Sequence, residues 1–382
     1  MRLISNEQAP MIVYLIALTA ALIAAFLNDR MTPALRKSIL IIICIYIILL
    51  MGFRYKVGID TISYMKAYRY IPPLDHLSLK AFSQTRFEPG FFILCSLCKT
   101  FTREFWPFQL LMAAITNGCI FYFLYRYCRN VFTGVTLYFI FSFLYFTTEV
   151  MRESAAVGIF LLNYRNLQEK RWARYYLISV ISILFHFSAI IILFFPLARL
   201  LNNKFIFYTS CIVFIGITPL VEKLNDILQI AAISGRIALY ASGADDLNFN
   251  WRIAELIRSA FPAIAILAAY HFAKKECEFK IMLLLQILFC MGAFAIPLIF
   301  SRFSNYTVIF VVAAAANVLS LETLKQWIKI CFISFVLLTQ VNYYHINYER
   351  WFPYISIFQP DDLPVRASLY RTTFLPWLRY VR

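Results

Sequence analysis

Apolar runs of roughly 14 to 23 residues recur along the whole chain, separated by short polar segments. A helix of about 20 apolar residues crosses the roughly 30 Å hydrocarbon layer of a bilayer. Every backbone amide and carbonyl inside lipid must find a partner within the protein, which favours helices over open sheets. The pattern therefore predicts an all-α fold, a polytopic transmembrane helical bundle of about 10–12 spans. The runs lie near residues 11–27, 38–53, 88–102, 105–124, 131–148, 154–167, 176–198, 205–221, 253–272, 281–300, 303–321 and 328–344.

No soluble domain fits between these runs. Of the 382 residues, 62% are hydrophobic and only 15% are charged. The longest polar segments, near 54–88 and 222–251 and in the tail 345–382, are each shorter than about 45 residues, which is too short for a separate core. We therefore expect a single integral membrane domain over residues 1–382, with two external loops and a polar tail.

The net charge of +16 indicates an anionic partner that is accessible to a membrane protein. An anionic membrane surface and an anionic lipid-linked substrate both fit this charge, whereas no nucleic-acid partner is expected. The nine cysteines lie in or beside apolar runs, which argues against a disulfide framework. Neither a phosphate-binding glycine motif nor an HExxH zinc motif occurs, so we expect no cofactor and no catalytic metal.

Basic loops should mark the cytoplasmic side of the membrane. If every run crossed the membrane, successive loops would alternate between its two sides. This alternation cannot place every basic loop on one side, because the runs 88–102 and 176–198 each change the side on which the following loops lie. One interpretation makes 88–102 an interfacial or re-entrant helix and lets 176–198 re-enter around His186. The alternative keeps both runs as spans and lets some arginine-rich loops face outward because they bind a ligand. We favour the first interpretation. It places the following loops on the external side: 54–88, 149–153, 222–251 and 301–304.

Charged residues within the apolar runs are the main candidates for function. Arg152 and Glu153 follow one long apolar run directly, and His186 lies 34 positions after Arg152 inside another, close to Ser188. A charge at such depth costs several kcal/mol in hydrocarbon, which favours a water-filled site or an anionic ligand over a purely structural role. His186 fits a general base or a sugar contact, although a hydrogen-bonded core histidine is the commoner role.

Arginines in the predicted external loops form a second group of candidates. Guanidinium groups bind a pyrophosphate bidentately and spread over several of its oxygens. For any single arginine, an interaction with lipid head groups is the competing interpretation. The arginines concerned are Arg54, Arg86, Arg152, Arg236 and Arg302.

The first external loop also carries an acid and a phenol. Gly58 permits a turn that would aim Asp60 back toward the membrane face, and Tyr64 lies one helical turn beyond Asp60. The competing interpretation makes Asp60 an ordinary helix cap in a polar loop. This loop alone does not decide between the two.

Several short motifs occur together in one order along most of the chain. They are FRYKVGIDTISY at 53–64, FEPGFF at 87–92, RESAA at 152–156, RNLQEKRWARYYLISVISILFHFSAIIIL at 165–193, ISGRIALYA at 233–241 and SRFSNY at 301–306. In these motifs the chain resembles the EpsG family of polysaccharide-biosynthesis membrane proteins, whose members resemble Wzy-type repeat-unit polymerases. One position departs from the family pattern, because Glu153 stands where a glutamine commonly follows the arginine.

The resemblance implies a fold and an activity. It implies a glycosyltransferase of GT-C type at the outer face of the bacterial inner membrane, acting on undecaprenyl-pyrophosphate-linked oligosaccharides. The growing glycan would pass from its carrier to the non-reducing end of an incoming lipid-linked unit. The implied partners are that substrate, membrane lipid, and a flippase and a chain-length regulator of the same pathway. The candidate bases are Asp60, Glu88, Glu153 and His186, of which Asp60 is our first choice. The candidate substrate-binding residues are Tyr64 and the five arginines.

Two other functions stay open at this stage. A flippase for the lipid-linked oligosaccharide also needs cations within the membrane, but such transporters usually show two related halves, and none is evident here. A membrane acyltransferase that modifies the glycan needs a catalytic histidine arrangement. None of the four histidines lies in a convincing pair of that kind.

Overall fold

The structure is a computed structural model, and it describes residues 9–83, 85, 87–216 and 249–378. Throughout these stretches the chain forms helices and no strand, and the one extended pairing is an isolated bridge between Arg54 and Ser356. Within the same stretches, four helices are long and apolar enough to cross a membrane, and shorter apolar helices accompany them. The predicted all-α membrane fold is confirmed. The four long helices are Met11–Arg30, Pro33–Gly52, Trp106–Tyr127 and Gln326–Ile346.

The chain falls into two compact units. The first contains residues up to Ile190 together with the C-terminal segment from Tyr344, and the second contains Ile191–Tyr343. The predicted single membrane domain stays a prediction, and each unit is described by itself. The predicted external loop at 222–251 falls almost entirely outside the described residues.

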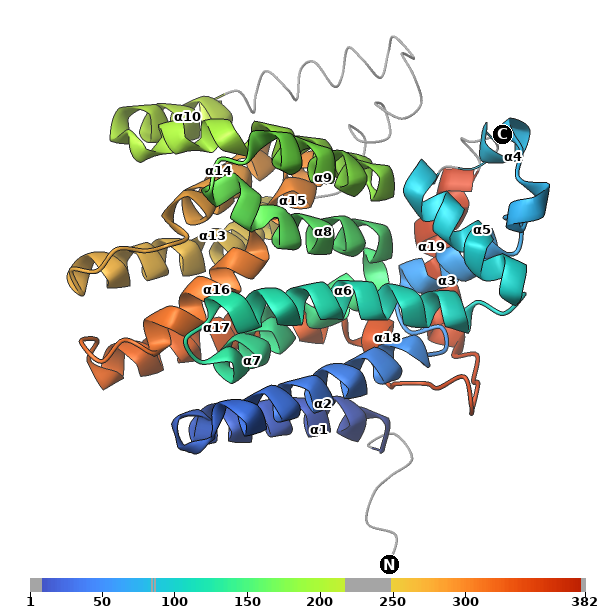
Figure 1. Cartoon of the computed structure of the whole chain (residues 1–382), viewed down its shortest axis with the longest axis horizontal. Coiled ribbons are helices and arrows are strands. Elements are labelled where there is room, and N and C mark those ends of the chain that lie inside the picture. Colours follow the sequence, from blue (N-terminus) through green and yellow to red (C-terminus); the bar gives the residue numbers. More distant parts are fainter. Residues whose placement is uncertain (1–8, 84, 86, 217–248, 379–382) are drawn as a thin grey trace, which may run out of the picture. The chain divides into compact units, whose positions relative to one another are not determined.

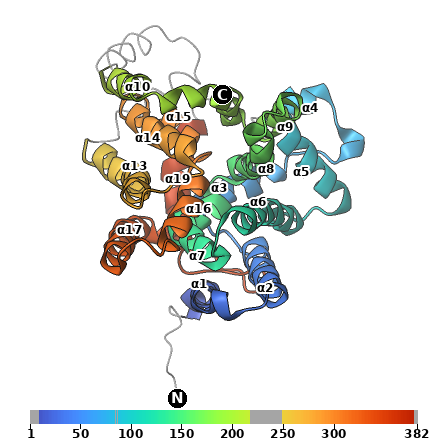
Figure 2. The ribbon, with the colours of Figure 1, turned by 60° about the vertical axis from the view of Figure 1, so that its left-hand side comes forward.

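The first unit carries most of the charged candidates. Its helices are α1 (Ala9–Leu27), η1 (Asn28–Arg30), α2 (Pro33–Gly52), α3 (Ile59–Tyr68), η2 (Leu74–His76), α4 (Leu79–Ser83), α5 (Pro89–Phe101), α6 (Trp106–Tyr127), α7 (Val131–Phe141), η3 (Tyr145–Glu149), α8 (Met151–Gln168), α9 (Trp172–Phe185), α18 (Tyr348–Trp351) and α19 (Pro364–Leu378). Helix α8 packs between α6 and α9 (Figures 1 and 2).

Local sequence explains where several of these helices begin. Thr32 caps α2 by accepting a hydrogen bond from the Leu35 amide at 3.3 Å, and Pro33 supplies the favoured first residue. Asn130 caps α7 in the same way, accepting from the Phe132 and Thr133 amides at 3.1 Å each. Both caps satisfy amide groups that a helix leaves unpaired at its start.

Helices α2 and α6 run antiparallel, so the segment between them returns to the end of the unit from which it started. The Gln109 side chain, in the first turn of α6, donates to the carbonyl oxygens of Gly52 at 2.7 Å and of Arg54 at 2.8 Å. Figure 1 shows α3, α4 and α5 gathered at this end, which we call the α3 end. The geometry agrees with the interpretation that the run 88–102 is not a simple crossing.

Basic loops lie at the opposite end of the same unit. There the Asn130 amide group donates to the carbonyl oxygen of Ala25 at 2.9 Å, and the Tyr127 hydroxyl donates to Gln168 at 3.3 Å. These contacts bring together the loops after α1, α6 and α8. The loops and their flanking turns carry Arg30, Arg36, Lys37, Arg126, Arg129, Arg165, Lys170, Arg171 and Arg174. This clustering is what the positive-inside rule expects of a cytoplasmic face.

The C-terminal segment packs against the α3 end. The Tyr55 amide donates to the Ile355 carbonyl at 2.7 Å, and the Ile357 amide donates to the Phe53 carbonyl at 2.8 Å. Close by, the Gly58 amide donates to the Arg350 carbonyl at 2.9 Å. The predicted polar tail is therefore a structured cover over the loop that follows α2.

The second unit is also helical in its described part. Its helices are η4 (Phe187–Asn202, whose first turn belongs to the first unit), α10 (Lys204–Gly216), α13 (Phe249–Phe272), α14 (Lys280–Ala295), α15 (Pro297–Ser304), α16 (Val308–Leu319) and α17 (Gln326–Ile346). One hydrogen bond in its core joins α14 to the residue that precedes α16. The Thr307 hydroxyl donates to the buried Gln286 side chain at 2.5 Å.

Candidate functional site

Arg152 lies at the start of α8 and forms an ion pair with Glu88, the residue that precedes α5. The two side chains are only 16% and 18% exposed. Three aromatic rings surround the guanidinium, with ring centres 5.1 Å away for Phe87 and 5.9 Å for both Tyr64 and Phe91. A guanidinium held by a carboxylate and aromatic faces keeps a fixed orientation.

Glu153, the next residue, contacts the segment that contains His186 and Ser188. The Ser188 hydroxyl donates to the Glu153 carboxylate at 3.3 Å, and the His186 ring nitrogen Nδ1 lies 2.7 Å from the same hydroxyl. Glu153 is almost completely buried, whereas His186 is half-buried. The spacing that the sequence singled out, from Arg152 to His186, therefore corresponds to a real juxtaposition.

Glu88 joins these two groups. Besides its pair with Arg152, its second carboxylate oxygen accepts a hydrogen bond from the Phe187 amide at 3.2 Å. Gly90 lets α5 approach α9 this closely, because a Cβ atom there would lie 2.8 Å from the Leu184 carbonyl oxygen. The Glu88-Pro-Gly90 motif thus fixes the start of α5 against the junction of α9 and η4. We call Glu88, Arg152, Glu153, His186 and Ser188 the Arg152 cluster.

Tyr64 connects the Arg152 cluster to α3. It packs with Phe87 and Phe91 in one buried group, while Asp60 lies one turn earlier on the same face of α3. The Asp60 side chain is half-buried. Asp60 therefore shares a helix face with Tyr64, whose ring lies near the Arg152 guanidinium.

Glu149 is a functional-site neighbour that the sequence analysis did not single out. Its carboxylate accepts hydrogen bonds from the Ile59 amide at 3.2 Å, the Asp60 amide at 3.0 Å and the Trp351 indole at 3.1 Å. A carboxylate at the start of a helix pairs free amides and interacts favourably with the helix dipole. Glu149 therefore fixes the start of α3, and with it the position of Asp60. Only its place in an apolar run, three residues before Arg152, could have drawn attention to it.

Arg54 is buried and bonds to the protein's own groups. Its Nη1 donates to the Met51 carbonyl and its Nη2 donates to the Thr61 hydroxyl at 3.2 Å, while that hydroxyl donates to the Thr148 carbonyl at 2.7 Å. Burial lowers the pKa of Arg54 to about 10, so the group keeps its charge at neutral pH. Arg54 thus ties α3 to the turn before α8, and it is only 2% exposed.

The five predicted arginines are divided between the two units and the residues outside the described stretches. Arg152 lies in the cluster named for it, Arg54 is buried nearby in the same unit, and Arg302 is half-buried at the end of α15 in the second unit. Arg86 and Arg236 lie outside the described residues.

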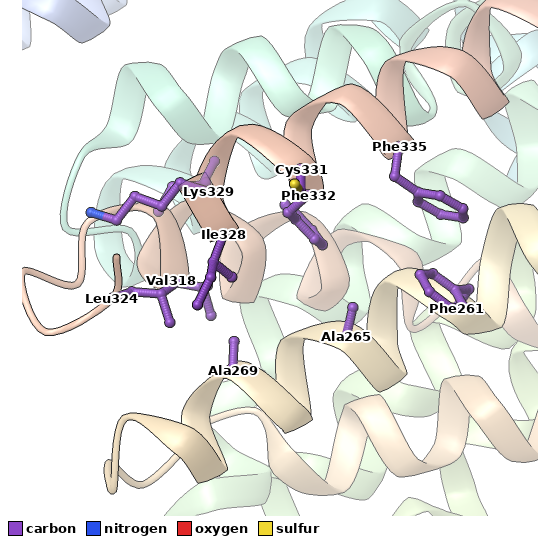
Figure 3. A pocket seen from close by; sticks show the side chains of 11 residues that line it. Phe261, Ala265, Ala269, Val318, Leu324, Ile328, Lys329, Cys331, Phe332 and Phe335 are labelled. Atoms are coloured by element: carbon purple, nitrogen blue, oxygen red, sulfur yellow. The ribbon is translucent and has the colours of Figure 1, made fainter. Parts of the chain in front are cut away.

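The structure also bears on metal binding and contains an apolar cavity. In the described part of the chain, no group of three or more His, Cys, Asp or Glu side chains is arranged to hold a metal ion. The second unit contains a cavity of about 310 Å³ between α13, α16 and α17 (Figure 3). Its lining is apolar except for Lys329, so it could hold a hydrocarbon chain but not perform acid–base chemistry.

A sequence model of the EpsG family matches residues 37–356, which is most of the chain. The chain belongs to the EpsG family. It is accordingly a multi-pass membrane protein of polysaccharide biosynthesis, as the motifs predicted. No curated protein and no solved structure matches this EpsG-family chain.

Proposed function

We propose that this EpsG-family protein polymerises lipid-linked oligosaccharide repeat units. In this proposal it transfers the growing glycan from undecaprenyl pyrophosphate to the non-reducing end of an incoming lipid-linked unit. The observation that carries the proposal is the Arg152 cluster, in which a fixed guanidinium, two carboxylates and a histidine meet at the ends of apolar helices. Family membership supports the pathway.

Arg152 is assigned to the pyrophosphate. In the transfer, the bond between the sugar anomeric carbon and the pyrophosphate oxygen breaks, and negative charge grows on that leaving group. A guanidinium whose position is already fixed stabilises this charge without reorganising. Glu88 and the aromatic rings hold Arg152 in place, so Glu88 is a positioning residue in this proposal.

The acceptor hydroxyl must lose a proton as the new bond to the anomeric carbon forms. His186 is the acceptor that the geometry supports best. The Ser188 amide donates to Nδ1 of His186 at 3.2 Å, so Nδ1 is the ring nitrogen whose lone pair can accept a proton. The Ser188 hydroxyl lies 2.7 Å from Nδ1 and contacts the buried Glu153 carboxylate at 3.3 Å, so it can give its hydrogen to Nδ1 while it takes the proton of the acceptor hydroxyl. Asp60 is the rival base, since it is half-buried on the same face of α3 as Tyr64.

The proposed setting is the bacterial inner membrane with the α3 end facing outward. The gathering of basic loops at the opposite end of the first unit supports this orientation. The proposed partners are the lipid-linked substrate, the surrounding lipid, and a flippase and a chain-length regulator of the same pathway. The likeness to GT-C glycosyltransferases stays part of the proposal, and so do Arg86, Arg236 and Arg302 as predicted substrate contacts. Arg54, which is buried against Met51 and Thr61, enters the proposal as a positioning residue for α3.

Cells that lack the protein provide the test. A polymerase defect leaves export intact, so surface lipid should carry single repeat units and no long chains. The same pattern is expected from His186→Gln at normal protein level, whereas Asp60→Asn should keep long chains. Long chains in His186→Gln and their loss in Asp60→Asn would make Asp60 the base instead. A deletion strain with neither single units nor chains at its surface would contradict the polymerase proposal and indicate a flippase.

A further inference from the structure

A basic pocket lies between α3 and α19 in the first unit, away from the Arg152 cluster. Its volume is about 470 Å³. Two acidic side chains line it, Asp361 and Asp362, so that five cationic ones leave an excess of three positive charges. The cationic side chains are Lys56, Lys66, Arg69, Arg366 and Arg371.

Most of this positive charge has no carboxylate partner. Asp362 pairs with Lys56, but among the described residues no ion pair joins Lys66, Arg69 or Arg371 to an acid. Burial, followed by repulsion from the neighbouring cations Lys56, Arg371 and Arg69, lowers the pKa of Lys66. The Lys66 ammonium lies 3.7 Å from the centre of the Tyr370 ring, which holds it at the pocket.

Arg366 adds a fixed cation to the same lining. It is only 2% exposed, and it donates from Nε to the Glu349 carbonyl at 3.2 Å and from Nη2 to the Pro353 carbonyl at 2.6 Å. Within the described part of the chain, its buried Nη1 has no hydrogen-bond partner. Burial lowers the pKa of Arg366 and the nearby Tyr14 and Glu149 side chains oppose this effect, so an anion at Nη1 would stabilise its charge further.

Apolar side chains complete the lining and narrow the ligand class. They are Ile62, Met65, Leu363, Ala367 and Tyr370. A pocket with convergent cations and an apolar wall suits a phosphate group, whose oxygens can bind several N–H donors at once.

We propose that the α3–α19 pocket binds a phosphate group, either on an anionic lipid or free in solution. The pocket is separate from the Arg152 cluster, because α3 presents Tyr64 to that cluster and Ile62 to α19. The inference therefore does not rest on the polymerase proposal. A ligand here would fasten the C-terminal helix to the helix that carries Asp60.

The test uses the purified full-length protein and follows its thermal unfolding midpoint, since a ligand bound only by the folded state raises it. One arm titrates inorganic pyrophosphate in detergent. The other compares nanodiscs of phosphatidylglycerol with nanodiscs of phosphatidylcholine. A saturable rise with pyrophosphate identifies a free phosphate ligand, and a rise only with phosphatidylglycerol identifies a lipid head group.

Matched variants locate the effect. The double variant Lys66→Gln/Arg371→Gln should weaken the response at least tenfold, while Lys66→Arg/Arg371→Lys, which keeps the charges, should retain it. The control Lys80→Gln/Arg103→Gln removes two exposed charges near the same end of the unit but outside the pocket, and it should respond as the native protein does. Asp362→Asn releases Lys56 and should strengthen the response. The proposal is overturned if neither probe raises the midpoint, or if the pocket and control double variants respond alike.

Discussion

At the scale of single residues, the central feature is an arginine that pairs with one acid and lies against three aromatic rings. Arg152→Lys keeps the charge but loses the planar fork that binds two oxygens at once. We expect at least a roughly tenfold loss of polymer at unchanged protein level, measured by gel analysis of surface glycan. Arg165→Lys is the matched control, because Arg165 lies near the far end of α8 in an exposed pair with Glu169. Native chain lengths in Arg152→Lys would instead favour a lipid-head-group role.

Glu153 offers a second test at this scale, because the hydrogen bond from Ser188 needs an acceptor but not a charge. Glu153→Gln keeps an acceptor oxygen, so polymer should persist. Glu153→Leu removes the acceptor that holds the Ser188 hydroxyl beside Nδ1 of His186, and it should abolish long chains. Chain-length distributions of the two variants at equal expression decide the matter. Equal activity in both would remove Glu153 from the proposed relay.

The sequence predicted part of this site because charge inside an apolar run is conspicuous. It singled out Arg152, Glu153 and His186, which the fold brings together with Glu88. It did not predict that Glu149 caps a helix about 90 residues earlier in the chain, because only the tertiary fold brings the two segments together. It predicted Arg54 as a pyrophosphate contact in an external loop, and the backbone carbonyl that Arg54 binds cannot be read from the side-chain pattern.

At the scale of elements, the turn before α3 is the most constrained connection. Gly58 has a φ of +90°, and a Cβ there would lie 2.7 Å from the Thr148 side chain. Gly58→Ala should therefore destabilise the protein by about 1–3 kcal/mol. Gly118→Ala is the control in α6, where a Cβ would meet nothing within 4 Å, and it should stabilise by about 0.5–1 kcal/mol. Thermal unfolding in detergent measures both, and a Gly58→Ala protein as stable as the native one would contradict the described turn.

Element boundaries show where pattern reasoning reaches its limit. Hydrophobicity located the long helices α2 and α6 well, because about 20 apolar residues leave few alternatives. The run 88–102 was ambiguous, and the contact of Gln109 with Gly52 shows that the chain returns to the same end. The run 176–198 divides at His186 into α9 and η4, and at this break Glu88 accepts from the Phe187 amide and Ser188 donates to Glu153, contacts that the hydrophobic pattern cannot reveal.

At the scale of the whole molecule, the orientation in the membrane can be tested by labelling. Ser78 lies in the segment between α2 and α6, and Gln168 lies in the basic turn between α8 and α9; both side chains are exposed. In a background without native cysteines, Ser78→Cys should react with a membrane-impermeant thiol reagent in intact spheroplasts, and Gln168→Cys should react only after lysis. The reverse pattern would place the Arg152 cluster on the inner side. The matching external position predicted at Ser242 lies outside the described residues.

The claim that this EpsG-family protein forms glycosidic bonds is tested most directly with the purified protein in detergent. There, no membrane separates two compartments, so transport cannot contribute to the result. Incubated with a lipid-linked single repeat unit, the native protein should produce a ladder of longer lipid-linked chains and release undecaprenyl pyrophosphate in proportion, and Arg152→Lys should produce little of either. A folded native protein that binds the lipid-linked unit but forms no ladder and releases no pyrophosphate carrier would contradict the account.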